Sequence, residues 1–182
     1  HVEDHHGPRQ ADVVLGVIRS ISNWHATRDD GYLSPFTRGM RRVDPKDLGG
    51  ILEVLLAVAE RGGTVYVAGN GGSAALSDHS ACDVSKGTHV DGHPPLRMVS
   101  LSSNAALITA IANDVAYDQV FRKQLEYYLR DGDAVLLVSA SGSSPNVVEA
   151  CRYARKRGVP TLAFVGFDGG ELKRVADHAI HP

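Results

Sequence analysis

The sequence predicts an α/β protein in which a parallel sheet is covered by helices on both faces. Two predicted strands, VLLVS at 135–139 and TLAFVG at 161–166, are almost entirely apolar, as is typical of strands buried on both sides. Strand-like and helix-like segments alternate from residue 64 to the end of the chain. Segments rich in Ser, Gly and Asn follow three of the strands, at the edge where such sheets bind ligands.

The first 47 residues are predicted to form a helical extension and a connector within the same domain. Apolar residues recur at helical spacing from Val13 to Trp24, so 11–25 is expected to be an amphipathic helix. Residues 26–43 show no clean period and are expected to be irregular. Asp44 as N-cap and Pro45 in the first turn then begin a helix that ends at Gly62 and Gly63.

Residues 48–182 are predicted to carry the sheet. We expect strands at 64–68, 96–101, 134–139, 160–166 and 178–181. Helical segments are expected at 73–86, 104–113, 117–129, 145–158 and 169–176.

Composition excludes several classes of protein. The chain has 182 residues, 43% of them hydrophobic, and a net charge of −2, so the basic excess of a nucleic-acid-binding protein is missing. No apolar run approaches the length of a membrane span. Cys82 and Cys151 lie in helix-like segments and are expected to be reduced thiols. We therefore expect a cytoplasmic protein.

The loops after the first three strands have the composition of a phosphate site. They read GNGGS from Gly69, SLSSNAAL from Ser100 and SASGSSPNVVEA from Ser139, and each leads into a helix. Glycines allow backbone N–H groups to approach an anion, hydroxyls donate to its oxygens, and helix N-termini favour negative charge. The third loop is the strongest candidate because four serines precede Pro145: Ser139, Ser141, Ser143 and Ser144. Helix capping is the alternative, but it needs only one serine.

GNGGS matches neither standard nucleotide-binding pattern. A P-loop requires Lys and then Ser or Thr after its last Gly, but Ser73 and Ala74 follow Gly72. Gly69, Gly71 and Ala74 satisfy only the loose dinucleotide pattern, and the second strand ends without an acidic partner for a ribose. In the helix that follows, His79 and Asp83 share a face at i, i+4. Such a pair can chelate a divalent metal or act as acid and base, although a surface ion pair is the commoner explanation.

These motifs together resemble the sugar isomerase (SIS) domain, and in particular the phosphoheptose isomerases. GNGGSAA followed by His79, SASGSSPNVVEA and FDGGELKRVADHAI carry the resemblance, which covers about residues 48–181. It implies a three-layer, flavodoxin-like sheet of five parallel strands and a homotetramer whose active sites lie between subunits.

The resemblance also implies roles for individual residues. Asn70 and Ser73 would contact substrate, while Ser139, Ser141 and Ser144 would hold the phosphate. His79 would ligate a metal, zinc or another divalent ion, and Asp83 stands where the family has a Glu that serves as ligand and acid/base. We expect the remaining loop residues to contribute to the substrate and phosphate site: Gly71, Gly72, Ser102, Ser103, Asn104 and Ser143. Asn104 replaces an Asp found in many members, and Ala140 replaces a Thr.

The family follows its last strand with a helix that completes the metal and acid/base set, whereas this sequence stops at Pro182. The opening HVEDHHGPRQADVVLGVIRSI resembles that helix. We therefore hypothesise that Glu3 to Ile21 takes its place, by permutation or from a neighbouring subunit, with Glu3 as a metal ligand and Glu3 or His6 as the second acid/base group. The alternative is a frayed His-rich terminus that leads into an ordinary N-terminal helix.

The expected activity is isomerisation of a phosphorylated sugar through an enediol, most specifically of sedoheptulose 7-phosphate to D-glycero-D-manno-heptose 7-phosphate. The competing class is non-catalytic: a phosphosugar sensor, or an oligomeric scaffold that binds other proteins.

Overall fold

The computed structural model describes residues 33–182, and the chain divides into two compact units with a boundary between Arg41 and Arg42. All but the last residue of α2 (Leu33–Arg42) belong to the first unit, and α2 is a helix where an irregular connector was expected, so that prediction was wrong over these residues. Leu33, Phe36 and Met40 recur at helical spacing, and Pro35 lies in the first turn, where its missing N–H is tolerated. The predicted helix at 11–25 lies outside the described residues.

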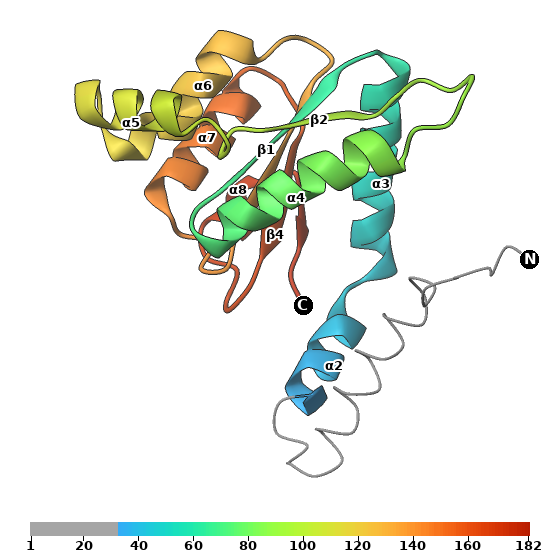
Figure 1. Ribbon diagram of the computed structural model, residues 1–182. Helices are drawn as coiled ribbons and strands as arrows, with labels where there is room; N and C mark the ends of the chain where they lie inside the picture. Colours follow the sequence, from blue (N-terminus) through green and yellow to red (C-terminus); the bar gives the residue numbers. More distant parts are fainter. Residues whose placement is uncertain (1–32) are drawn as a thin grey trace, which may run out of the picture. The chain divides into compact units, whose positions relative to one another are not determined.

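The second unit is built on a five-stranded parallel sheet with the order β2-β1-β3-β4-β5 (Figure 1). The strands are β1 (Thr64–Gly69), β2 (Arg97–Ser100), β3 (Ala134–Ser139), β4 (Thr161–Val165) and β5 (His178–Ile180). The helices are α3 (Pro45–Glu60), α4 (Gly72–Gly87), α5 (Ala105–Asp114), α6 (Val120–Tyr128), α7 (Pro145–Lys156) and α8 (Leu172–Val175), with a 3-10 turn at Tyr117–Gln119. This strand order is flavodoxin-like, which confirms the predicted fold class.

Helices cover both faces of this sheet (Figure 1), and an apolar core lies between helices and sheet on each face. Alternate residues of each strand point to opposite sides, so Val65 and Val67 pack beneath α3 and α4, while Val135 and Leu137 pack beneath the later helices. All six residues of β3 are buried, as expected for a central parallel strand.

The strand order creates a crevice between β1 and β3. From β1 the chain crosses outward to β2, and from β3 it crosses to β4 on the other side of the sheet. The loops that leave β1 and β3 therefore diverge at their carboxyl ends, which is where ligands bind in open α/β sheets.

The two cysteines lie in different surroundings. Cys151 is completely buried in α7, and burial raises the pKa of its thiol to about 11, although a hydrogen bond with Thr161 acts in the opposite direction. Cys82 is exposed on α4. Within residues 33–182, no helix is both long and apolar enough to cross a bilayer.

Thiol labelling should distinguish the two cysteines. Because burial blocks access and the raised pKa keeps Cys151 protonated well above neutral pH, iodoacetamide at pH 8 should modify only Cys82 in the native protein. Denatured protein should take up two equivalents by mass spectrometry. Two equivalents on the native protein would contradict the packing of α7.

Candidate active site

A pocket of about 230 Å³ lies at the carboxyl ends of β1 and β3. Most of its lining carries hydroxyl or amide groups, and the remainder is Val138, Ala140 and Phe167. The polar lining residues are Asn70, Ser73, Ser139, Ser141 and Ser144. The structure therefore brings together two loops that are about 70 residues apart in sequence.

The serine loop, Ser139–Ser144, joins β3 to α7. Ser139 is buried, and its Oγ accepts a hydrogen bond from the Gly142 N–H at 3.1 Å. Ser144 is the N-cap of α7, but its side chain makes no capping hydrogen bond. Its hydroxyl therefore lines the pocket without being engaged by the helix end. Ser143 differs from these, since its Oγ lies toward Gly170, where an added Cβ would come within 2.4 Å of it.

Replacing Ser144 with alanine tests which role its hydroxyl has. We expect KM for a phosphosugar to rise about tenfold or more, because a hydrogen bond to a charged group contributes about 1.5–3 kcal/mol. Thermal stability should hardly change, because no cap is lost. Ser143→Ala is the matched control and should leave KM unchanged. A fall in stability by about 1 kcal/mol with an unchanged KM would instead show that Ser144 acts as an ordinary cap.

Two local constraints favour glycine in the GNGGS loop, one at Gly69 and one at Gly71. A Cβ on Gly69 would lie 2.7 Å from the Cβ of Ser73, so the end of β1 can pass close to α4 only with glycine there. Gly71 has φ 54° and ψ −120°, a backbone conformation that favours glycine. With this turn, Ser73 enters the first turn of α4 and lines the pocket.

Asn70 is held by two residues that the sequence interpretation missed. Its amide forms a reciprocal pair with Asn146, with hydrogen bonds of 2.8 and 2.9 Å, and the Tyr117 hydroxyl donates to its Oδ1 at 3.1 Å. Asn146 is buried, so this pair fixes the Asn70 amide at the pocket. The sequence offers only one local sign of Asn146, its polar side chain at the end of SSPN. Its partner, Asn70, lies in another loop.

The segment after β2 is engaged in hydrogen bonds within the chain. The Ser102 hydroxyl donates to the Gly69 carbonyl at 2.9 Å and accepts from the Gly69 N–H at 3.2 Å. Ser103 donates to the Ser100 carbonyl, and Asn104 caps α5 by accepting from the Leu107 N–H. None of the three lines the 230 Å³ pocket, and neither do Gly71 and Gly72. Their substrate-binding roles stay predictions, and in this structure Ser102 supports the end of β1.

His79 and Asp83 lie one turn apart on α4, with His79 Nε2 and Asp83 Oδ2 3.0 Å apart. Both side chains are largely exposed, at 73% and 64%. Imidazole nitrogen and carboxylate oxygen are ligands that zinc accepts at about 2.0–2.2 Å, so one ion can contact both atoms. Within residues 33–182 no group of three His, Cys, Asp or Glu side chains is placed to hold a metal. The pair thus fits part of a divalent-metal site, and Glu3 and His6, predicted to complete it, lie outside the described residues.

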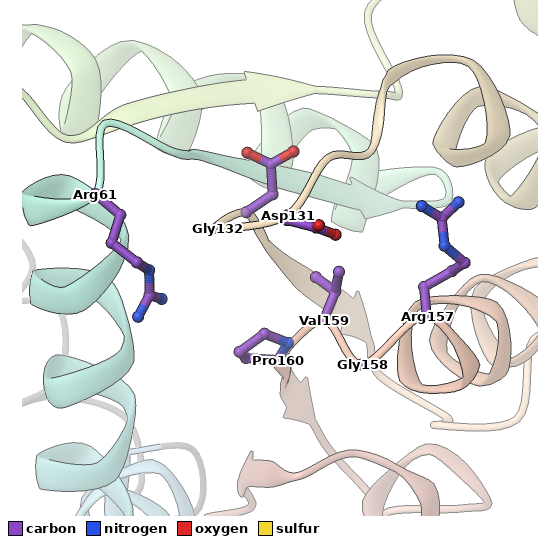
Figure 2. A pocket seen from close by; sticks show the side chains of 8 residues that line it. Arg61, Asp131, Gly132, Arg157, Gly158, Val159 and Pro160 are labelled. Atoms are coloured by element: carbon purple, nitrogen blue, oxygen red, sulfur yellow. The ribbon is translucent and has the colours of Figure 1, made fainter.

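A second hollow, of about 380 Å³, lies at the opposite edge of the sheet (Figure 2). It is lined by loops that precede β1, β3 and β4, and Figure 2 shows Arg61 and Arg157 on opposite sides of it. No serine and no amide side chain lines it. The pocket at the carboxyl ends of β1 and β3 is therefore the candidate active site.

Comparison with known proteins agrees with this geometry. The sequence profile of the SIS domain family matches residues 31–166, about three quarters of the chain. The chain belongs to the SIS domain family. It is 37% identical over 150 residues to a probable phosphoheptose isomerase of Thermoplasma acidophilum, with 82% of each chain covered. It is also 44% identical over 128 residues to a phosphoheptose isomerase of Chlorobium phaeobacteroides, covering 70% of this chain and 57% of that protein.

Solved structures show the same SIS fold. A phosphoheptose isomerase from Neisseria gonorrhoeae superposes with a TM-score of 0.73 and 28% identity, over 91% of this chain and 84% of that one. A phosphoheptose isomerase from Francisella tularensis shares the fold, with a TM-score of 0.76, 23% identity and coverage of 91% and 85%. The predicted resemblance to the SIS domain and its phosphoheptose isomerases is therefore confirmed.

Proposed function

We propose that this SIS domain protein is an aldose–ketose isomerase that converts sedoheptulose 7-phosphate to D-glycero-D-manno-heptose 7-phosphate. The observation that carries the proposal is a pocket lined by four serine side chains beside a helix that bears the His79–Asp83 pair. Hydroxyls and helix N-termini suit a phosphate, and the pair supplies a proton donor and acceptor. The similarity of the chain to phosphoheptose isomerases supports the same activity.

The reaction needs a base at carbon and a proton donor at oxygen. A base removes a C1 proton of the ketose, and protonation of the C2 oxygen gives the enediol. Return of a proton to C2, with loss of the C1 hydroxyl proton, then gives the aldose. We assign the carbon-bound proton to the Asp83 carboxylate and the oxygen-bound protons to His79, with Glu3 or His6 as the further acid/base group. Asn70 and three residues of the serine loop, Ser139, Ser141 and Ser144, hold the phosphate end and so orient the reacting carbons.

We propose that His79, Asp83 and Glu3 hold zinc or another divalent metal. The His79 imidazole nitrogen and the Asp83 carboxylate oxygen lie 3.0 Å apart, which supports the first two of these ligands. Such an ion would supply Lewis-acid stabilisation of the enediolate oxygen in place of proton donation by His79, whose ring nitrogen would then be a metal ligand. Chelation should lower turnover, and added zinc should restore it.

We also propose that the protein is a homotetramer with active sites shared between subunits. Leu48, Leu52 and Leu56 form an apolar stripe on α3 at i, i+4 and i+8, and each is about half exposed. Leu52→Asp should therefore reduce the mass measured by light scattering, whereas Glu53→Gln on the same helix should not.

We place the protein in the cytoplasm, since its two free thiols are typical of a reducing compartment.

Product formation tests the proposed function. The full chain should convert sedoheptulose 7-phosphate, with the aldose detected by NMR, and should not convert sedoheptulose, which lacks the phosphate. Tight phosphosugar binding without product at any metal loading would indicate a sensor and contradict the proposal.

A further inference from the structure

Phe167 is the one large apolar side chain that is exposed at the candidate phosphate pocket. It lies two residues after the end of β4, lines the pocket with the serine loop, and is 83% exposed. The other apolar lining residues, Val138 and Ala140, are smaller. A ligand that covers such an exposed aromatic ring removes apolar surface from water, which makes the free energy of binding more favourable.

The backbone of Phe167 is strained. Its φ of 47° makes it the sole non-glycine residue with positive φ in the described chain. The same loop has glycine at 169 and 170, where φ is also positive. At position 167, by contrast, the residue with positive φ is a phenylalanine. A bulky residue in this conformation is disfavoured and persists where the surrounding structure imposes it.

Contacts from the C-terminal segment hold Phe167 in this backbone conformation. The His181 ring nitrogen Nε2 lies 2.9 Å from the Phe167 carbonyl oxygen, and Nδ1 lies 2.9 Å from Lys173 Nζ. Because the ammonium group can only donate, Nδ1 accepts and Nε2 carries the proton donated to Phe167.

The loop is also fixed to the serine loop itself. The Gly166 N–H donates to the Ala140 carbonyl at 3.1 Å, and the Leu172 N–H donates to the Gly142 carbonyl at 2.7 Å. A Cβ on Gly170 would lie 2.3 Å from the Ser141 carbonyl oxygen, so the two loops are in close backbone contact. The backbone at Phe167 is therefore held beside the serine loop, and its side chain lines the same pocket as the serine hydroxyls.

We propose that Phe167 is a substrate-binding residue that covers the phosphate end of the bound sugar phosphate, an inference that rests on the proposed function. Its ring excludes water from one side of the phosphate, and hydrogen bonds from the serine hydroxyls are stronger in that less polar surrounding. The strained backbone is retained because it presents the ring to the ligand.

Three replacements of Phe167 test this assignment. Phe167→Ala and Phe167→Gly should each raise KM for sedoheptulose 7-phosphate about tenfold with kcat unchanged, since binding is lost equally in ground and transition states. The inhibition constant of inorganic phosphate should rise in parallel. Phe167→Leu should keep most of the affinity. Phe167→Gly alone should raise Tm, by about 2–4 °C, because glycine relieves the positive φ. Tyr127→Ala, which removes another exposed aromatic, should change neither KM nor the phosphate constant.

Each contrary result overturns the assignment in a distinct way. An unchanged KM in Phe167→Ala and Phe167→Gly would show that the ring does not contact the ligand. A raised KM with an unchanged phosphate constant would place the ring against the sugar rather than the phosphate. A change in oligomeric mass with unchanged KM would assign the ring to a contact between copies. If the wild-type protein binds the phosphosugar without turnover, the isomerase proposal fails, and calorimetric affinities of the same variants still decide the role of Phe167.

Discussion

Replacing His79 with alanine is expected to lower the turnover of sedoheptulose 7-phosphate at least about 100-fold, because a positioned acid–base group contributes about 10²–10⁴-fold. The loss should fall on kcat, since His79 does not line the serine pocket that we propose holds the phosphate. Initial rates of aldose formation, measured at saturating substrate, provide the readout.

A second exposed His–Asp pair provides the control for this variant. His89 Nε2 lies 3.4 Å from Asp91 Oδ1, in the segment between α4 and β2. His89→Ala removes the same chemical group and should leave kcat unchanged. If the two variants had equal activity, the His79–Asp83 pair would be an ordinary surface ion pair.

Replacing Gly142 with alanine is expected to destabilise the protein by about 2–4 kcal/mol, the sum of about 1 kcal/mol for a side chain at positive φ and about 1–3 kcal/mol for overpacking. Gly142 has φ 62°, and an added Cβ would lie 2.0 Å from the Gly169 carbonyl oxygen. The serine loop and the loop after β4 would then have to separate. Chemical denaturation followed by circular dichroism measures the effect.

Gly158→Ala separates the two contributions. Gly158 has φ 70°, but an added Cβ there meets nothing within 4 Å. Gly158→Ala should therefore lower the free energy of unfolding only by the backbone contribution, about 1 kcal/mol. Equal losses in the two variants would mean that the close contact between the loops does not exist in solution.

Local sequence patterns predicted most of the fold because they report burial. The apolar run of β3 predicted a strand buried on both faces, and the alternation of strands and helices predicted the parallel sheet. The prediction failed at α2, where a short apolar period lies among three arginines, two of them at the end of the helix. Long-range strand order followed from the family resemblance, since no local pattern encodes which strands are neighbours.

The candidate site was predictable in composition but not in detail. Four serines before Pro145 indicated an anion site, and the family resemblance implied that Ser139, Ser141 and Ser144 hold the phosphate. The structure shows that Ser144 lines the pocket and that Ser143 lies toward Gly170. The support of Asn70 by Asn146 and the exposure of Phe167 depend on contacts between loops far apart in sequence. Sequence spacing cannot report such contacts.

Solvent deuterium exchange tests the central claim, enediol isomerisation of a phosphosugar, most directly. Sedoheptulose 7-phosphate is incubated with the full chain in D₂O and followed by proton NMR. The proposed function predicts that the aldose appears, that the ketose C1 proton is replaced by deuterium, and that both changes are lost in His79→Ala. A protein that binds the phosphosugar but yields neither aldose nor exchange, with zinc and other divalent metals supplied, would contradict it.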